Sequence, residues 1–369
     1  MKDISVMICD DSALMRNLIG RIVDEADGLV LAGKAMNGKF LLDKIPRLKP
    51  DIILLDLEMP EMNGIEFLKE RKRLNIDIPV VILSSIAVRG ARVTMDALSL
   101  GASDFILKPS GSISEDIHVV RDRIVSTLLA YGKKSSNSPN TRQTHTGTKE
   151  TESPLQVNTK TENSPAVSST IHREKGGKID IVAIGISTGG PNALRLVLAD
   201  IDPDFPVPIV IVQHMPAGFT TEFAKSLDRI CPLKVKEVTD GDVLSKGRIF
   251  IAPGNFHIEV EKKKLAAIIR TSSADLVNGH RPSADVLFSS VAKHYGGNSL
   301  AVIMTGMGRD GASEIGSIYA KGGITIGQDE ESSIVYGMPK VAAERGFIEH
   351  VVSVNNMADT LNKLVKEKR

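Results

Sequence analysis

The chain has 369 residues, which is long for one typical domain and favours two. Apolar residues make up 42% and charged residues 25%, and the net charge of +1 gives no electrostatic reason to expect nucleic acid or an anionic membrane as partner. There are two cysteines, far apart in sequence, no run long enough to span a bilayer, and a first apolar run that begins too early to follow a secretory signal. We therefore expect a soluble cytoplasmic protein with reduced thiols and no membrane insertion.

Short apolar runs alternate with amphipathic stretches through about residue 131. This alternation predicts a parallel sheet covered by helices on both faces. Its strands are expected at Ile4–Cys9, Leu29–Ala35, Ile52–Asp56, Val80–Ser84 and Phe105–Leu107.

Polar and charged residues end or follow four of these strands, at the edge where the carboxyl ends of parallel strands meet. They are Asp10, Asp11, Asp56, Ser84 and Lys108. Three carboxylates at one edge repel one another unless a hard cation joins them, and Mg²⁺ is the natural occupant. The ammonium and the hydroxyl can then contact a phosphoryl group carried by a carboxylate.

The motifs Cys9–Ser12, Asp56–Gly64 and Lys108-Pro109 resemble the receiver domain of two-component response regulators over residues 1 to about 125. The resemblance implies a (βα)5 fold in which a histidine kinase phosphorylates Asp56. It also implies that Asp10, Asp11 and Asp56 bind Mg²⁺, that Ser84 is the switch hydroxyl and that Lys108 contacts the phosphoryl group. Phe105 stands at the family's aromatic switch position, although a Phe on a buried strand is equally well a core residue. The Lys108-Pro109 bond is a candidate cis peptide.

Composition changes abruptly between Lys133 and Gly177, where 15 of 45 residues are Ser or Thr and none is aromatic. Such a segment buries too little apolar surface to offset the entropy of ordering it. We predict a receiver domain at 1–131, a disordered linker at 132–177 and a second domain at 178–369.

The second domain also reads as α/β, because apolar runs again alternate with amphipathic stretches. Lys262-Lys263-Lys264 divides two of its runs into the arms of a hairpin. The strands are expected at Ile179–Ile184, Ile209–Val212, Arg248–Ala252, His257–Glu261, Leu265–Arg270, Leu300–Met304 and Thr325–Gly327.

A glycine-rich segment, Gly185–Gly190, follows the first of these runs and leads into a helical pattern. Such a turn fits a dinucleotide pyrophosphate, or a serine nucleophile held at a strand-to-helix turn. The dinucleotide fold needs an acidic residue at the end of the second strand, whereas Gln213-His214 stands there. The nucleotide interpretation is therefore the weaker one.

His214 is expected beside Ser187, one strand away, as a general base. Asp310, in the glycine-rich turn after the strand at Leu300–Met304, can accept from the imidazole and hold its tautomer. The order Ser, His, Asp differs from the Ser, Asp, His order of α/β-hydrolases, so a different fold is implied. The remaining histidines, His280 among them, follow no strand that ends near the turn, and His257 is the nearest competitor.

The second half resembles the catalytic domain of chemotaxis protein-glutamate methylesterases over about residues 179 to 350, through the motifs Ile184–Gly190, Gln213–Phe219, Ala252–His257, His280–Phe288, Met304–Ala312 and Tyr336–Pro339. The resemblance implies a Rossmann-like fold with a hairpin. It implies Ser187 as nucleophile, His214 as base, Asp310 as its orienting partner, and Thr188 and Met307 beside the oxyanion.

The same resemblance implies hydrolysis of glutamate γ-methyl esters on methyl-accepting chemoreceptors, with release of methanol and without a cofactor, and deamidation of receptor glutamines. The unphosphorylated receiver is expected to lean on the catalytic edge and block it. Two alternatives remain: a non-enzymatic regulator whose receiver gates protein binding, and an esterase of small molecules. A DNA-binding output is disfavoured because the second half has no helix-turn-helix pattern and no basic excess.

Overall fold

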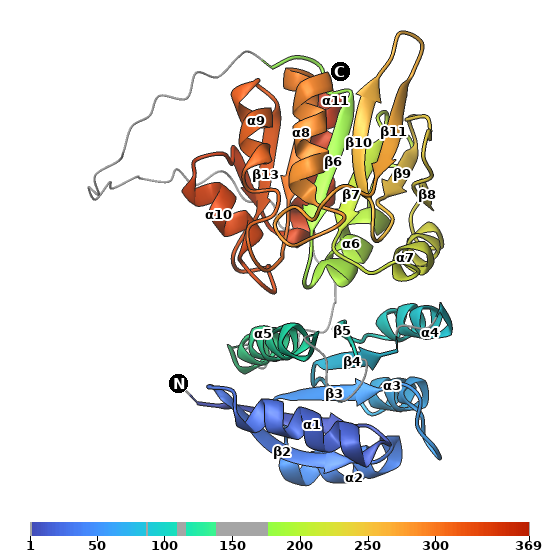
Figure 1. The fold of residues 1–369 in the computed structure, drawn as a ribbon, viewed down its shortest axis with the longest axis vertical. Coiled ribbons are helices and arrows are strands. Elements are labelled where there is room, and N and C mark those ends of the chain that lie inside the picture. The colour runs from blue at the N-terminus through green and yellow to red at the C-terminus, as the bar shows by residue number, and fades with distance from the viewer. Residues whose placement is uncertain (1, 86–87, 109–115, 138–175, 369) are drawn as a thin grey trace, which may run out of the picture.

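The computed structural model describes residues 2–85, 88–108, 116–137 and 176–368. It contains two α/β units in succession, one ending at residue 137 and one starting at 176 (Figure 1). The fold class predicted from the sequence is confirmed, because each unit is built on a parallel sheet with helices on both faces.

The N-terminal unit contains β1 (Ile4–Cys9), α1 (Ala13–Asp24), β2 (Leu29–Ala35), α2 (Gly38–Leu48), β3 (Ile52–Asp56), α3 (Gly64–Arg73), β4 (Val80–Ser84), α4 (Val88–Ser99), β5 (Asp104–Leu107) and α5 (Asp116–Asn137). Its strands pair in parallel in the order β2-β1-β3-β4-β5. All five predicted strands are present, and β5 begins one residue earlier than predicted.

The turns after β1 and β3 are fixed by helix caps. Ser12 Oγ accepts a hydrogen bond from the backbone N–H of Met15, and Asn63 forms a reciprocal capping box with Glu66 at the start of α3. Because β3 and β4 are buried along their whole length, the residues that end them are held firmly at the carboxyl edge of the sheet.

The C-terminal unit contains β6 (Ile181–Ile186), α6 (Gly190–Ala199), β7 (Ile209–Gln213), α7 (Phe219–Asp228), β8 (Lys234–Glu237), β9 (Arg248–Ile251), β10 (His257–Lys262), β11 (Ala267–Ser272), α8 (Ala284–His294), η1 (Gly296–Asn298), β12 (Ser299–Ile303), α9 (Glu314–Ala320), β13 (Ile324–Gln328), α10 (Met338–Glu344), β14 (His350–Val352), η2 (Val354–Asn356) and α11 (Met357–Glu367). Seven parallel strands lie in the order β14-β13-β12-β6-β7-β9-β8. The strand order reverses between β6 and β12, where open α/β sheets form a crevice at their carboxyl ends.

The predicted hairpin is present as β10 and β11, an antiparallel pair that forms a separate sheet. Two edge strands of the main sheet, β8 and β14, were not predicted. The first reads Lys-Val-Lys-Glu and the second has three residues, so neither carries a strong apolar signal. The first strand of this unit lies two residues later than predicted, at Ile181–Ile186.

Helix α5 continues to Asn137, beyond residue 131, where the linker was predicted to begin. Most of that predicted linker, residues 138–175, lies outside the described residues, as does Pro109 of the candidate cis bond. No helix in the described part of the chain is both long and apolar enough to cross a membrane.

The two units face each other through β5, α4 and α5 on the N-terminal side and α6 and α7 on the C-terminal side (Figure 1). The α6 helix starts directly after the glycine-rich turn and α7 follows β7, so this interface lies beside the carboxyl edge of the larger sheet.

Candidate active site and phosphorylation site

Ser187 follows β6 in the turn that opens α6. Gly189 has φ +79°, a left-handed conformation that favours glycine, and it is the N-cap of α6. A Cβ on Gly190 would lie 2.0 Å from Oε1 of Gln213, so that position has no room for a side chain. The backbone N–H of Ser187 donates to the carbonyl of Thr305, which fixes the turn against the loop after β12.

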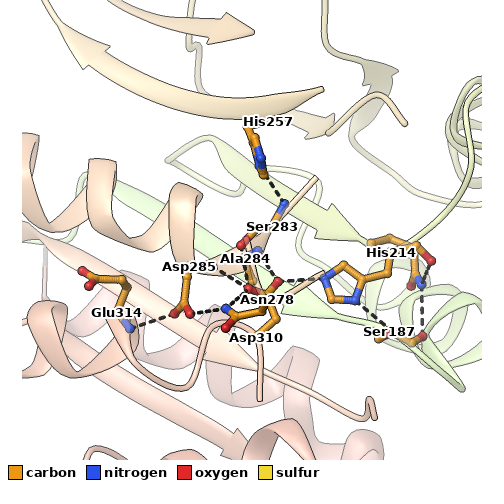
Figure 2. A network of polar contacts seen from close by, with 10 residues as sticks. Ser187, His214, His257, Asn278, Ser283, Ala284, Asp285, Asp310 and Glu314 are labelled. Carbon is orange, nitrogen blue, oxygen red and sulfur yellow. Dashed lines mark hydrogen bonds and ion pairs between the residues drawn. The ribbon is translucent and has the colours of Figure 1, made fainter. Parts of the chain in front are cut away.

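His214 lies between Ser187 and Asp310 (Figure 2). Its Nδ1 is 3.1 Å from Oγ of Ser187, and its Nε2 is 2.8 Å from Oδ2 of Asp310. A proton on Nε2 is donated to the carboxylate, which leaves Nδ1 to accept the hydroxyl proton of the serine. Three residues from three different strand ends thus form one chain of hydrogen bonds, as the sequence predicted for their positions.

Asp310 is 1% exposed and is surrounded by donors at the N-terminus of α8. Its carboxylate accepts from Oγ of Ser283 at 2.6 Å, from the N–H of Ala284 at 2.6 Å and from Nδ2 of Asn278 at 2.9 Å. Although burial alone raises its pKa, hydrogen bonding and charge interaction with His214, and the bonds from Ser283 and Asn278, lower it well below the usual range. Asp310 therefore stays ionised and can hold the imidazole.

A second layer supports this carboxylate (Figure 2). Asn278 Nδ2 also donates to Asp285 at 2.7 Å, and Asp285 accepts from the N–H of Glu314 at 2.9 Å. His257, the competing histidine of the sequence analysis, accepts the N–H of Ser283 on Nδ1 and lies 2.9 Å from the carbonyl of Asp275 through Nε2. It braces the loop before α8 and contacts neither Ser187 nor His214.

The sequence analysis did not place His280 at the site, but in the structure its side chain lies against His214. Its ring stacks on that of His214, with centroids 3.9 Å apart and an interplanar angle of 17°. It belongs to the loop between β11 and α8, and no strand end marks it. The loop brings it back to the sheet edge through long-range packing, which the sequence pattern alone does not reveal.

Thr188 and Met307 both lie next to Ser187. A Cβ on Gly306 would come within 2.8 Å of Cβ of Ser187, so the loop after β12 passes directly over the serine and Met307 follows it. Among the described residues, neither the N–H of Thr188 nor that of Met307 donates a hydrogen bond. Both N–H groups are therefore open to another acceptor.

The acidic residues of the N-terminal unit also converge. Asp10, Asp11 and Asp56 each offer a carboxylate oxygen, and these oxygens lie within 4.8 Å of one another. Nζ of Lys108 is 2.8 Å from Oδ2 of Asp56 and 3.0 Å from Oδ2 of Asp10. A set of three carboxylates fits a hard divalent cation such as Mg²⁺.

The buried carboxylate of Asp56 is stabilised by nearby positive charge. Burial raises the pKa of its carboxyl group, and the ion pair with Lys108 offsets part of that rise. Burial alone lowers the pKa of Lys108, but its hydrogen bonds and charge pairing with Asp56 and Asp10 raise it overall. The ammonium therefore stays charged and neutralises part of the acidic cluster.

Asp56, Ser84 and Lys108 line one small cavity of about 20 Å³, room for about one water molecule. Ser84 Oγ is 2.7 Å from Oγ1 of Thr94 on α4.

Phe105 lies away from this cavity, at the boundary between the two units. Its ring stacks on Phe219, the first residue of α7, with centroids 5.0 Å apart and an interplanar angle of 4°. Neighbouring polar contacts accompany the stack: Nδ2 of Asn192 on α6 donates to the carbonyls of Ala102 and Ser103 at 2.9 and 2.8 Å. The predicted switch position is therefore buried against the helix that follows the loop of His214.

Helix α5 makes a second contact across the boundary. Lys134 Nζ donates to the carbonyl of Ser333 at 3.0 Å, in the loop between β13 and α10. Ile334 of the same loop packs against the core of the N-terminal unit, and its side chain lies beside Gly189. The N-terminal unit thus touches the loops that surround Ser187, while Ser187 itself keeps part of its surface exposed.

Comparison with known proteins agrees with this division. The family profile described as Response regulator receiver domain matches residues 6–118, and the one described as CheB methylesterase matches residues 182–361. The protein-glutamate methylesterase/protein-glutamine glutaminase of Treponema denticola is 57% identical and covers 100% of both chains. That of Treponema pallidum is 49% identical and covers 99% of this chain and 98% of its own.

A solved structure matches the C-terminal unit. The CheB methylesterase catalytic domain of Thermotoga maritima is 38% identical, covers 51% of this chain and 100% of its own, and superposes with a TM-score of 0.50.

Proposed function

Since the chain belongs to the family of protein-glutamate methylesterase/protein-glutamine glutaminases that carry a receiver domain, we propose that the hydrogen-bonded chain Ser187–His214–Asp310 is its hydrolytic centre. The protein is a methylesterase that acts in chemotaxis adaptation, and its receiver domain makes that activity responsive to phosphorylation. The observation that carries the site assignment is the pair of distances at His214, 3.1 Å to the serine and 2.8 Å to the carboxylate.

The proposed reaction begins with attack of Ser187 Oγ on the γ-carbonyl carbon of a glutamate methyl ester. His214 Nδ1 takes the hydroxyl proton, and Asp310 stabilises the imidazolium that forms. The N–H groups of Thr188 and Met307 hydrogen-bond to the oxyanion, which is supported by their having no other acceptor in the described residues. The C–O bond to the methoxy group then breaks, and His214 returns its proton so that methanol leaves.

Water completes the cycle by the same route. His214 takes a proton from the water as it attacks the acyl-serine, and the serine leaves with the proton that His214 returns. The products are a glutamate carboxylate and free enzyme. A glutamine side chain enters the same sequence with ammonia in place of methanol, which accounts for deamidation at one site. None of these steps requires a cofactor.

For the receiver domain we propose that Asp56 accepts a phosphoryl group from a histidine kinase. Asp10, Asp11 and Asp56 would hold Mg²⁺, which neutralises the charge of the transferring phosphoryl group when bound. Lys108 would pair with the phosphoryl oxygens and Ser84 would donate a hydrogen bond to them. Phe105, stacked on Phe219, would transmit the change to the catalytic domain. This assignment is supported by the convergence of the three carboxylates and by the contact of Lys108 with Asp56.

Methyl-accepting chemoreceptors are the proposed substrates, and the cytoplasm, predicted from the composition, is the proposed location. Release of methanol from a methylated chemoreceptor separates the enzyme from a non-catalytic regulator. Peptide mass spectrometry of acid-quenched mixtures should then find Ser187 esterified to a receptor glutamyl peptide. The same ester at another residue, with methanol still released, would contradict the assignment of Ser187.

A further inference from the structure

His280 is the one side chain whose ring lies on the imidazole of His214 among the aromatic contacts of the described residues. The rings are nearly parallel and 3.9 Å apart, so His280 touches a ring face and leaves both nitrogens of His214 to Ser187 and Asp310. A ring stacked on one face limits how far the His214 imidazole can tilt towards His280 and out of line with these two partners.

The backbone holds His280 firmly in this position. Val277 and His280 exchange two backbone hydrogen bonds, of 3.1 and 3.0 Å, which close a tight turn. Arg281 follows His280 directly, and its guanidinium donates to the carbonyls of Ser273 and Ala274, each at 2.8 Å. These bonds anchor the chain next to His280. The tight turn also contains Asn278, which donates to Asp310 at 2.9 Å. One turn thus supports both the carboxylate and the imidazole.

We propose that His280 is a positioning residue of the triad, whose ring face holds the His214 imidazole in line and stabilises the imidazolium that forms during acylation. The face of a neutral aromatic ring attracts a cation, so the contact is stronger in the charged state of His214 than in the neutral one. The proposal rests on the proposed function of the triad and adds a residue to it.

His280 must itself stay neutral for this role. The pKa of His280 is lowered to about 4. Burial is the main cause, and charge repulsion from His214 is the second. Asp310 acts in the opposite direction, and Arg123 on α5 adds to the lowering from across the domain boundary. Its ring is therefore uncharged at neutral pH.

Two variants separate the ring face from the ring nitrogens. His280→Phe keeps a flat aromatic face and removes the titratable nitrogens, while His280→Ala removes the face. His294→Ala is the matched control, because it removes a histidine from the last turn of α8, about 15 Å along the helix from Ala284, whose N–H bonds to Asp310. Thermal unfolding of each full-length variant checks that it folds.

The readouts are kcat/KM for methanol release between pH 5 and 9, and the rate at which a fluorophosphonate labels Ser187. We expect His280→Ala to lose about tenfold in both at pH 8 and its acidic limb to move to lower pH, because the imidazolium has lost its stacking partner. His280→Phe should stay within about threefold of wild type in both readouts and keep the wild-type limb.

An activity of His280→Ala within twofold of wild type, an equal loss in both variants, or a loss with an unmoved acidic limb would each overturn the proposal. Labelling keeps this test separate from the proposed function. A wild-type protein that is labelled at Ser187 but releases no methanol refutes the function, while the effect of His280 on labelling still decides the positioning role.

Discussion

The carboxylate of Asp104, on the last strand of the receiver domain, accepts a hydrogen bond from the backbone N–H of Gly189 at 2.9 Å. Gly189 lies two residues after Ser187, so the receiver is bonded directly to the turn that holds the proposed nucleophile. The same carboxylate is buried and also bonds to Phe105 N–H and the Tyr131 hydroxyl, at 2.9 and 3.3 Å. Any change at Asp56 that moves β5 therefore also moves Asp104, and through its hydrogen bond the turn that holds Ser187.

Weakening the interface between the receiver and the catalytic domain should raise the activity of the unphosphorylated protein. Asn192→Ala removes two hydrogen bonds to the receiver and leaves the triad untouched. A net loss of about 1 kcal/mol at the interface corresponds to about a fivefold shift in the domain equilibrium. Methanol release without phosphodonor should rise by about this factor.

The control for this variant is Asn362→Ala, whose side chain bonds only within the C-terminal unit, to Asp200 and Asp202. It should leave basal activity unchanged. Equal basal rates for Asn192→Ala and wild type would mean that this contact does not restrain the enzyme.

Removing the receiver should also raise methanol release in the absence of phosphodonor. A protein lacking residues 1–131 is expected to release methanol faster than unphosphorylated full-length protein, because the receiver then no longer packs on α6 and α7. Helix α5 continues to Asn137, so this cut falls inside a helix. A second deletion, of residues 1–175, checks that the remnant plays no part. A lower rate in both truncations would show that the receiver recruits substrate instead of restraining the enzyme.

Asp56→Asn should keep basal activity and lose activation by a small-molecule phosphodonor with Mg²⁺, because an amide cannot form the acyl phosphate. Asp43→Asn, an exposed substitution on α2, is the matched loss of one carboxylate and should respond as wild type does. Phosphodonor-dependent methanol release is the measurement. Full activation of Asp56→Asn would place the phosphorylated group elsewhere.

Asp310→Asn should reduce kcat by roughly 10⁴-fold, because the amide presents the wrong partner to Nε2 of His214. The variant also carries a pH signature. The pKa of Asp310 is lowered in the folded protein, so its contribution to stability is complete above about pH 4 and is lost as the pH falls below that value.

Urea titrations between pH 2.5 and 7 test this signature. The free energy of unfolding should fall more steeply below pH 4 in wild type than in Asp310→Asn. Ser187→Ala keeps the carboxylate and should follow the wild-type slope. Parallel slopes for wild type and Asp310→Asn would show that this carboxylate gains nothing from its donors.

The main strands and both strand-end clusters were predictable because short apolar runs alternate with amphipathic stretches along the chain. Once the runs are placed in parallel sheets, topology alone brings Ser187 towards His214, and Asp56 towards Lys108. What could not be predicted depends on packing between distant segments. The stack of His280 on His214 and the bond from Gly189 to Asp104 each join residues that share no strand end and no periodic pattern.

Phe105 illustrates the same limit. Its position on a buried strand is equally consistent with a core residue and with a switch, and only the position of α7 shows that it stacks on Phe219 at the domain boundary. Edge strands β8 and β14 were missed because a short or charged edge strand buries too little apolar surface to leave a pattern.

The most direct test of the account is methanol release from a methylated chemoreceptor, followed in full-length wild type and Ser187→Ala before and after addition of phosphodonor and Mg²⁺. Wild type should release methanol and do so faster after phosphorylation, while Ser187→Ala should release none under either condition. Near-normal release by Ser187→Ala, or a wild-type rate that phosphorylation leaves unchanged, would contradict it.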